Sequence, residues 1–332
     1  PPPLLRIIPL LGCCRAIRPV TYDILTWCPA SPGRLSKFGK GCDEMALWFR
    51  ESASPAHRLE WKIRQELYSG QSPFQSIQVL DTEQFGPSLV LDGIMQTTTG
   101  DEFIYHEMLA YVPLLAHPHP RRVLIIGGGD GGLAREVLKV PGVEEVVLVE
   151  IDPVVVEVAR RFLPQHTVAL DDPRLTLIHA DGAAYLTDQK TEPFDVILVD
   201  STDPEGDGPG TVLYTPAFHQ ALYEGLADDG LYVQQTGAAF YNPEVVEQVS
   251  HSVVTRFPLC RVYWCTVPTY PGALFTFTSG SKRYDIQKPS TPLTWPTRWY
   301  TPQIHQLAFA LPPYLSQRLP ETVVTAQKGP NA

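Results

Sequence analysis

The sequence predicts an α/β protein whose main sheet is parallel, preceded by a small antiparallel β region. Short continuous apolar runs, such as RVLIIGG (122–128) and DVILVD (195–200), have the length of strands buried on both faces. Helical patterns such as PVVVEVARRFL (153–163) lie between these runs. Before residue 100, in contrast, apolar and polar residues alternate, with breaks at FGP and LDG, which is typical of antiparallel hairpins.

The alternation of strands and helices continues along the chain. Further strands are expected in EVVLVE (145–150), LTLIHAD (175–181) and LYVQQT (231–236), and further helices in GLAREVLKV (132–140) and PAFHQALYEGL (216–226). This order predicts a parallel sheet with helices on both faces. Ligands of such sheets bind at the carboxyl ends of the strands.

Composition divides the chain into four expected segments. These are a disordered or spurious leader (1–42), a β-hairpin domain (43–100), an α/β domain (101–318) and a flexible tail (319–332). The leader has six basic residues and one acid, a charge of +5, so the total of −10 leaves −15 for the rest. An organelle transit peptide is the alternative for the leader, because such peptides are basic and poor in acids.

Cysteine usage and charge limit the compartment and the partners. Only Cys260 and Cys265 lie outside the leader, which predicts a reduced, cytoplasmic protein without a disulfide framework. The acidic balance argues against nucleic acid and suits small cationic ligands. The apolar stretch near the N-terminus is short and interrupted by Arg6, so we expect no membrane span.

A glycine-rich turn follows the first strand of the α/β region. Gly127, Gly129 and Gly132 satisfy G-x-G-x-x-G, and Glu150 ends the next strand, at the spacing of an acid that binds a ribose. A pyrophosphate prefers bare amides at a helix N-terminus, and the carboxylate of Asp130 inside the turn would repel it. The turn therefore favours a nucleoside without phosphate and with positive charge, such as a sulfonium nucleoside.

Five carboxylates end strands or follow them directly: Asp130, Glu150, Asp181, Asp200 and Asp203. At one sheet edge they would repel one another unless a ligand with two cationic groups lay among them. Asp181 could also meet the amino group of an adenine. The alternative is that some of these residues are helix N-caps, where aspartate is common.

Several motifs together resemble the polyamine aminopropyltransferases, the family that includes spermidine synthase. They are DEFIYHEM (101–108), VLIIGGGDGG (123–132), EID (150–152), DSTDP (200–204) and TVPTYPG (266–272), and the resemblance covers roughly residues 46–318. It implies a methyltransferase-like Rossmann fold with a mostly parallel seven-stranded sheet, and a homodimer or homotetramer. It also implies transfer of the 3-aminopropyl group from decarboxylated S-adenosylmethionine to putrescine, giving spermidine and 5′-methylthioadenosine. No permanently bound cofactor and no metal are implied.

The resemblance also implies a role for each matching residue. Asp200 corresponds to the carboxylate that accepts a proton from the attacking amine. The nucleoside donor would be bound by Gln75, Asp130, Glu150, Asp181, Gly182 and Pro209. The polyamine and aminopropyl groups would be bound by Tyr105, His106, Asp130, Asp200, Asp203 and Tyr270.

Elementary chemistry agrees with these roles. An alkylammonium resembles lysine, with a pKa of about 10.4, and must lose a proton before its nitrogen can attack carbon. A carboxylate with an ordinary pKa of about 3.9 is a weak base for that task, so the site must mainly orient and desolvate the reactants. Asp130 would disfavour ordinary S-adenosylmethionine, whose own carboxylate carries the same charge.

Two places depart from the family pattern. The loop PEGDGPGTVLY (204–214), which contains Pro209, is about two residues longer than usual. Gly237, in QQTGA, stands where many relatives carry a glutamate. Loss of that acid could change the acceptor, so an enzyme that uses agmatine or a longer polyamine is the alternative to one that uses putrescine.

Three other classes remain as rivals on the residues alone. The glycine motif by itself fits a nicotinamide-dependent oxidoreductase, which NAD binding would reveal. A methyltransferase would use the donor that still has its carboxylate. A non-catalytic binding module would have no reason to keep Tyr105, Asp200 and Asp203 together.

Overall fold

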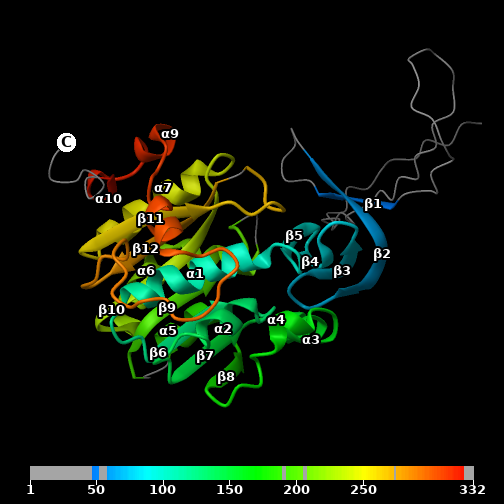
Figure 1. The fold of residues 1–332 in the computed structure, drawn as a ribbon, viewed down its shortest axis with the longest axis horizontal. Helices are drawn as coiled ribbons and strands as arrows, with labels where there is room; N and C mark the ends of the chain where they lie inside the picture. The colour runs from blue at the N-terminus through cyan, green and yellow to red at the C-terminus, as the bar shows by residue number, and fades with distance from the viewer. Residues whose placement is uncertain (1–46, 52–57, 189–191, 205–207, 273, 325–332) are drawn as a thin grey trace, which may run out of the picture.

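The computed structural model describes residues 47–51, 58–188, 192–204, 208–272 and 274–324 (Figure 1). The leader (1–42) lies outside the described residues. The first sheet is antiparallel, in the order β1-β2-β3-β4-β5. Its strands are β1 (Leu47–Glu51), β2 (Leu59–Gln71), β3 (Ser76–Thr82), β4 (Gly86–Leu91) and β5 (Ile94–Thr98). The period-two alternation before residue 100 thus forms the predicted hairpins.

The second sheet has seven strands in the order β11-β12-β10-β9-β6-β7-β8. They are β6 (Arg122–Gly127), β7 (Glu145–Glu150), β8 (Leu175–His179), β9 (Phe194–Asp200), β10 (Leu226–Ala238), β11 (Leu259–Cys265) and β12 (Phe275–Ser281). The five strands from β10 to β8 are parallel to one another. Strand β12 is antiparallel to both of its neighbours, β10 and β11, so β11 runs in the same direction as the other five. The predicted mostly parallel, seven-stranded sheet is confirmed.

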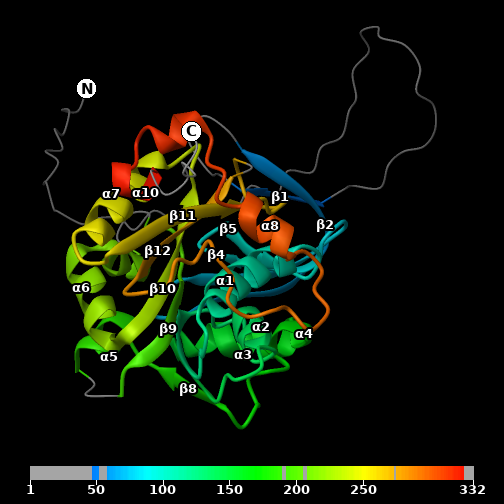
Figure 2. The same ribbon diagram turned by 60° about the vertical axis from the view of Figure 1, so that its left-hand side comes forward.

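Helices cover both faces of this sheet (Figure 2). On one face lie α1 (Glu102–Ala116) and α2 (Gly132–Val137), and on the other α5 (Gly182–Asp188), α6 (Pro216–Gly225) and α7 (Pro243–Val254). The four central strands are buried on both faces, which explains why the sequence shows apolar runs there instead of alternation. Their carboxyl ends meet at one edge.

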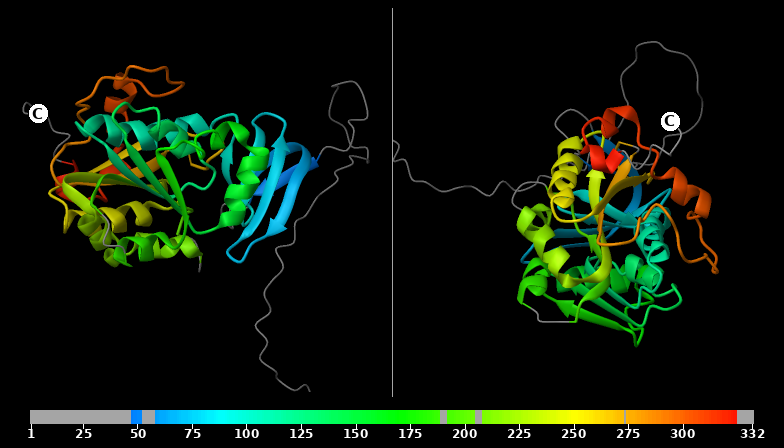
Figure 3. Two further views of the ribbon diagram at one scale, coloured as in Figure 1. Left: turned by 90° about the horizontal axis from the view of Figure 1, so that it is seen from below. Right: turned by 90° about the vertical axis from the view of Figure 1, so that its left-hand side faces the viewer.

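Helix α3 (Pro153–Phe162) joins the two sheets, which lie on either side of it (Figure 3). Ile77, Val79 and Leu89 of the first sheet form one buried cluster with Val155 and Ala159 of α3. The antiparallel sheet is therefore fixed beside the carboxyl edge of the parallel sheet. The short helix α4 (Pro164–Thr167) follows directly.

Helix α1 is buried along nearly its whole length because the C-terminal segment crosses it. The Glu107 carboxylate accepts hydrogen bonds from the backbone N–H groups of Arg298, Trp299 and Tyr300, at 2.7–2.8 Å. The remaining described elements are η1 (Pro209–Tyr214), α8 (Pro302–Leu307), α9 (Pro313–Ser316) and α10 (Glu321–Val324).

The sequence predicts a flexible tail from residue 319, and for residues 319–324 this is wrong. Leu319 and Val323 are buried in the core cluster that also holds α7, and α10 packs against β11. Because the sequence around this segment is rich in proline, it does not show that Leu319 and Val323 are core residues. Residues 325–332 lie outside the described part. Among the described helices, none is long and apolar enough to cross a membrane.

Candidate active site

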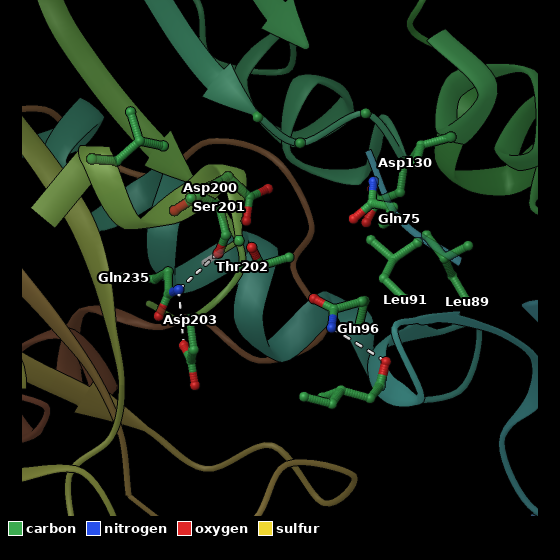
Figure 4. Close-up of a pocket in the computed structure, with 18 of the residues that line it drawn as sticks. Gln75, Leu89, Leu91, Gln96, Asp130, Asp200, Ser201, Thr202, Asp203 and Gln235 are labelled. Atoms are coloured by element: carbon green, nitrogen blue, oxygen red, sulfur yellow. Dashed lines mark hydrogen bonds between the residues drawn. The ribbon is translucent and has the colours of Figure 1, made fainter. Parts of the chain in front are cut away.

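A cavity of about 510 Å³ opens at the carboxyl edge of the parallel sheet, against the antiparallel sheet. Its size is in the range of small-molecule sites, roughly 300–1,000 Å³. Ten predicted site residues line it: Gln75, Tyr105, His106, Asp130, Glu150, Asp181, Gly182, Asp200, Asp203 and Tyr270. Figure 4 shows Asp203 and Gln235 on one side of the open space and Gln75, Leu89 and Leu91 on the other.

The glycine-rich turn makes room for the backbone of one of these residues and the side chains of two others. A Cβ at Gly127 would lie 2.1 Å from the Asp200 carbonyl oxygen. One at Gly129 would lie 2.8 Å from the Glu150 carboxylate, and one at Gly132 would lie 2.2 Å from the His106 ring. Gly127 also has a φ of 80°. The close approach of site residues therefore requires the three glycines of the sequence motif.

Glu150, at the end of β7, is held by backbone donors. Its carboxylate accepts the N–H groups of Gly129 (3.0 Å) and Asp152 (2.9 Å). Burial raises its pKa to about 7, although these two hydrogen bonds act in the opposite direction. A buried carboxylate that keeps acceptor capacity is suited to the hydroxyl groups of a ribose.

Asp181 and Gln75 also line this cavity. Asp181 accepts the N–H groups of Ala183 (2.8 Å) and Ala184 (3.1 Å), so the alternative of a helix cap holds for this residue while it also lines the cavity. The Gln75 amide donates to the Asp152 carboxylate at 2.9 Å, which ties β3 to the start of α3.

Asp200, at the end of β9, lies at the junction of the cavity. The Tyr105 hydroxyl donates to its Oδ1 at 2.7 Å. Burial raises the pKa of Asp200 to about 6, against the lowering effect of the positive charge on His106. Burial also raises the pKa of Tyr105 well above its usual value, so this phenol stays protonated and keeps donating.

Asp203 is held by a side chain. The Gln235 amide donates to Asp203 Oδ1 (3.0 Å), to the Ser201 carbonyl (2.7 Å) and to the Tyr214 hydroxyl (2.7 Å). Gly237 has a φ of 74°, and a Cβ there would lie 3.2 Å from both carboxylate oxygens of Asp203. Because Gly237 has no side chain, the Asp203 carboxylate can occupy the space beside it.

A charged network lies beneath the cavity. His106 Nδ1 contacts Glu102 at 2.6 Å, and its Nε2 lies 3.7 Å from Asp130 Oδ2. Burial opposes protonation of His106, but the charges of Asp130 and Glu102 prevail and raise its pKa to about 9. Arg135 binds Glu102 at 2.8 Å. The imidazole is therefore an imidazolium at neutral pH.

Tyr270 lines the cavity beside Tyr105, and its hydroxyl donates to the carbonyl of Gln96. Its ring lies 5.9 Å from that of Tyr105 in an edge-to-face arrangement. Pro209 begins η1, but its side chain, like residues 205–207, lies outside the described part of the structure, so this prediction stays untested.

Sequence patterns do not single out three further residues of the cavity. Glu51 of β1 is buried and contributes a carboxylate to the lining, Gln96 contributes from β5, and Gln235 holds Asp203. The only signal for Gln235 was its place at the end of a predicted strand beside Gly237. Glu51 and Gln96 lie in the first sheet, whose contribution depends on how the two sheets pack.

At the opposite edge of the sheet, His117, Asp195 and Asp229 bring three potential metal-ligand atoms within 4.8 Å of one another. His117 Nδ1 accepts the backbone N–H of His119 at 3.2 Å. The proton of the neutral ring therefore lies on Nε2, the atom that faces the carboxylates. A metal ion on Nε2 would require this proton to move to Nδ1 and would break the hydrogen bond from His119.

Comparison with known proteins identifies the class to which this fold and cavity belong. Residues 102–289 match the model of the spermine/spermidine synthase domain, and residues 47–99 match that of the spermidine synthase tetramerisation domain. The polyamine aminopropyltransferase of Desulforudis audaxviator is 44% identical over 276 residues, which cover 82% of this chain and 99% of that protein. That of Thermoanaerobacter sp. (strain X514) is 47% identical over 274 residues, 82% of this chain and 98% of the relative.

Solved structures agree. A spermidine synthase in complex with the transition-state analogue AdoDATO is 40% identical, with a TM-score of 0.77, over 82% of this chain and 94% of that one. The spermidine synthase of Thermotoga maritima is 38% identical, with a TM-score of 0.74 over the same shares.

The chain therefore belongs to the spermine/spermidine synthase family. Within that family it is an enzyme of the polyamine aminopropyltransferase type, as the resemblance of its motifs predicted.

Proposed function

We propose that this enzyme transfers the 3-aminopropyl group of decarboxylated S-adenosylmethionine to putrescine, with Asp200 as the proton acceptor. The products are spermidine and 5′-methylthioadenosine. The observation that carries the proposal is the position of Asp200, a half-buried carboxylate held by Tyr105 between the Glu150 end and the Asp203 end of one cavity.

In the proposed reaction, a neutral amine nitrogen attacks the methylene carbon bonded to sulfur. The new C–N bond forms while the C–S bond breaks, and its electron pair neutralises the sulfonium. The nitrogen then carries an extra proton, which passes to Asp200. A carboxylate whose pKa is about 6 is a better base than one with the ordinary value, because its pKa is closer to the working pH.

The two ends of the cavity support a division of labour. Glu150, Asp181, Gly182 and Gln75 would bind the nucleoside, with Glu150 on the ribose hydroxyls. Asp203, Tyr270 and His106 would surround the polyamine, and Asp130 the aminopropyl amine. Asp130 and Asp203 then face cationic groups, which offsets the cost of gathering carboxylates.

Gly237 is the reason to consider a second candidate for the acceptor substrate. The position that carries an acid in many relatives has no side chain here, and the φ of 74° together with the contact to Asp203 leaves little space for one. Agmatine or a longer polyamine is therefore the alternative acceptor of the same reaction. We also propose that the chain forms a homodimer or homotetramer, which the match to the tetramerisation domain supports.

The deciding experiment measures release of methylthioadenosine from decarboxylated S-adenosylmethionine with putrescine, agmatine and spermidine in parallel. We expect the highest kcat/KM with putrescine. A higher kcat/KM with agmatine or spermidine would leave the mechanism in place and change the acceptor. No release with any of the three amines would refute aminopropyl transfer to these acceptors.

A further inference from the structure

A fully buried histidine outside the cavity lining, His166 of α4, lies beneath Asp130 (Figures 1 and 2 place α4 beside α2). Its Nδ1 is 4.0 Å from Asp130 Oδ1, and its Nε2 is 4.0 Å from Glu102 Oε1. Among the described residues, neither ring nitrogen has a hydrogen-bond partner. Buried polar atoms without partners are costly and rare, so this position needs an explanation.

The main chain of α4 is pressed against the glycine-rich turn. A Cβ at Gly131 would lie 3.1 Å from Thr167 Cα and 3.3 Å from the His166 carbonyl oxygen. Arg135 of α2 also donates to the carbonyl of Gln165 at 3.0 Å. The His166 ring is therefore held in place, and a shift of about 1 Å by either carboxylate would bring it within hydrogen-bond distance.

Charge counting shows why the state of this ring matters. The groups that face it are Glu102 and His106 from α1, Asp130 from the turn and Arg135 from α2. Two carboxylates, one guanidinium and one imidazolium sum to zero, so His166 completes a balanced network only when it is neutral. Burial indeed lowers the pKa of His166 below its usual value of 6.5.

We propose that His166 is a positioning residue for Asp130: its neutral imidazole donates from beneath to Asp130 Oδ1, and its protonation weakens the attraction of Asp130 for the ammonium group of the substrate. The proposal rests on the proposed function, which places the aminopropyl amine at Asp130. An added proton would bring a net charge of +1 under a site that must bind a cation.

The two ligands needed for the test differ in the aminopropyl group and in the positive charge of the sulfonium that bears it. Methylthioadenosine has the nucleoside but no aminopropyl group, whereas decarboxylated S-adenosylmethionine has both. Without an acceptor neither ligand reacts, so calorimetry gives equilibrium Kd values. The ratio of the methylthioadenosine Kd to the donor Kd then isolates the aminopropyl end from the nucleoside end.

The ratio is measured from about pH 8 to about pH 5 for the wild type, His166→Gln and His166→Leu. Gln keeps an N–H donor but cannot gain a proton. Leu has no donor and cannot gain a proton either. At the upper pH we expect the Gln variant to match the wild type and the Leu variant to have a ratio about threefold lower. On acidification, the wild-type ratio should fall about three- to tenfold further than that of either variant.

Titration of Asp200 lowers the ratio equally in all three proteins, so only the difference between them reports on His166. His219→Gln is the matched control, because His219 is also buried and has a lowered pKa, of about 4, but lies elsewhere. A methylthioadenosine Kd equal to that of the wild type verifies that a variant is folded. If the Leu variant does not fold, the comparison of the wild type with the Gln variant tests the role of His166.

Parallel curves for wild type, Gln and Leu would overturn the role of His166 while leaving the proposed function intact. A wild-type ratio near one at every pH would instead refute the placement of the amine at Asp130, and the inference about His166 would fall with it.

Discussion

The two ends of the cavity are built in different ways. At the nucleoside end, Glu150 and Asp181 each accept two backbone N–H groups from the turns that follow β6, β7 and β8. At the junction and at the proposed acceptor end, Asp200 and Asp203 are held by side chains, the Tyr105 hydroxyl and the Gln235 amide. Under the proposed assignment, nucleoside recognition rests on the backbone of the fold, whereas acceptor recognition can change with single substitutions.

The junction between the two ends should give the largest effect. We expect Asp200→Asn to lower kcat by about 10²- to 10⁴-fold, because the amide cannot take the proton. Methylthioadenosine affinity should stay within about twofold, because Glu150 and Asp181 are unchanged. The rate of methylthioadenosine release and calorimetry on the same preparation measure both. A kcat within about threefold of the wild type would exclude Asp200 as the proton acceptor.

At the nucleoside end, Glu150→Gln should weaken methylthioadenosine binding by about 10- to 100-fold. The change removes hydrogen bonds to a charged acceptor, each of which contributes about 1.5–3 kcal/mol. The KM for the acceptor at saturating donor should not change. If the acceptor KM rose as much as the nucleoside Kd, the two ends would not be separate.

At the acceptor end, Gln235→Met keeps the volume but removes the amide that holds Asp203. We expect the acceptor KM to rise by about tenfold, with methylthioadenosine affinity unchanged. Initial rates across acceptor concentrations, together with calorimetry, measure the two quantities. A normal acceptor KM would mean that Asp203 keeps its position without Gln235.

The sequence predicts the Glu150 end of the cavity more completely than the Asp203 end. Period-two and continuous apolar runs predicted both sheets, and G-x-G-x-x-G with Glu150 predicted where the glycine-rich turn meets the end of the next strand, because backbone turns require particular residues at fixed spacing. Gln235 and Glu51 were not predicted as cavity residues, because they reach the cavity only through packing between segments distant in the sequence. The same holds for Glu102, Arg135 and His166, which three separate helices bring together under Asp130.

The smallest expected effect is that of Asp200→Asn on the free energy of unfolding. The pKa of Asp200 is about 6 in the folded protein, against a usual value of 3.8. A carboxyl whose folded pKa is raised costs stability once it ionises, so the cost begins above pH 3.8, grows up to about pH 6 and persists at higher pH. Asp200→Asn should therefore raise the free energy of unfolding by about 1–3 kcal/mol near pH 8.

The gain should vanish near pH 4, where the wild-type carboxyl is protonated as well. Urea unfolding at the two pH values measures the difference. Tyr105→Phe serves as a comparison, because it removes the donor to Asp200 and should destabilise the protein at the higher pH. A gain of equal size at both pH values would show that burial of the charge is not its cause.

The independence of the two ends is tested most directly by a double-mutant cycle of Glu150→Gln and Gln235→Met. The measured quantity is the rate of methylthioadenosine release at substrate concentrations well below both KM values. Our account predicts that the two losses add in free energy within about 0.5 kcal/mol, as for sites without shared partners. A coupling energy above about 1 kcal/mol would contradict it and show that nucleoside and acceptor are recognised by one connected unit.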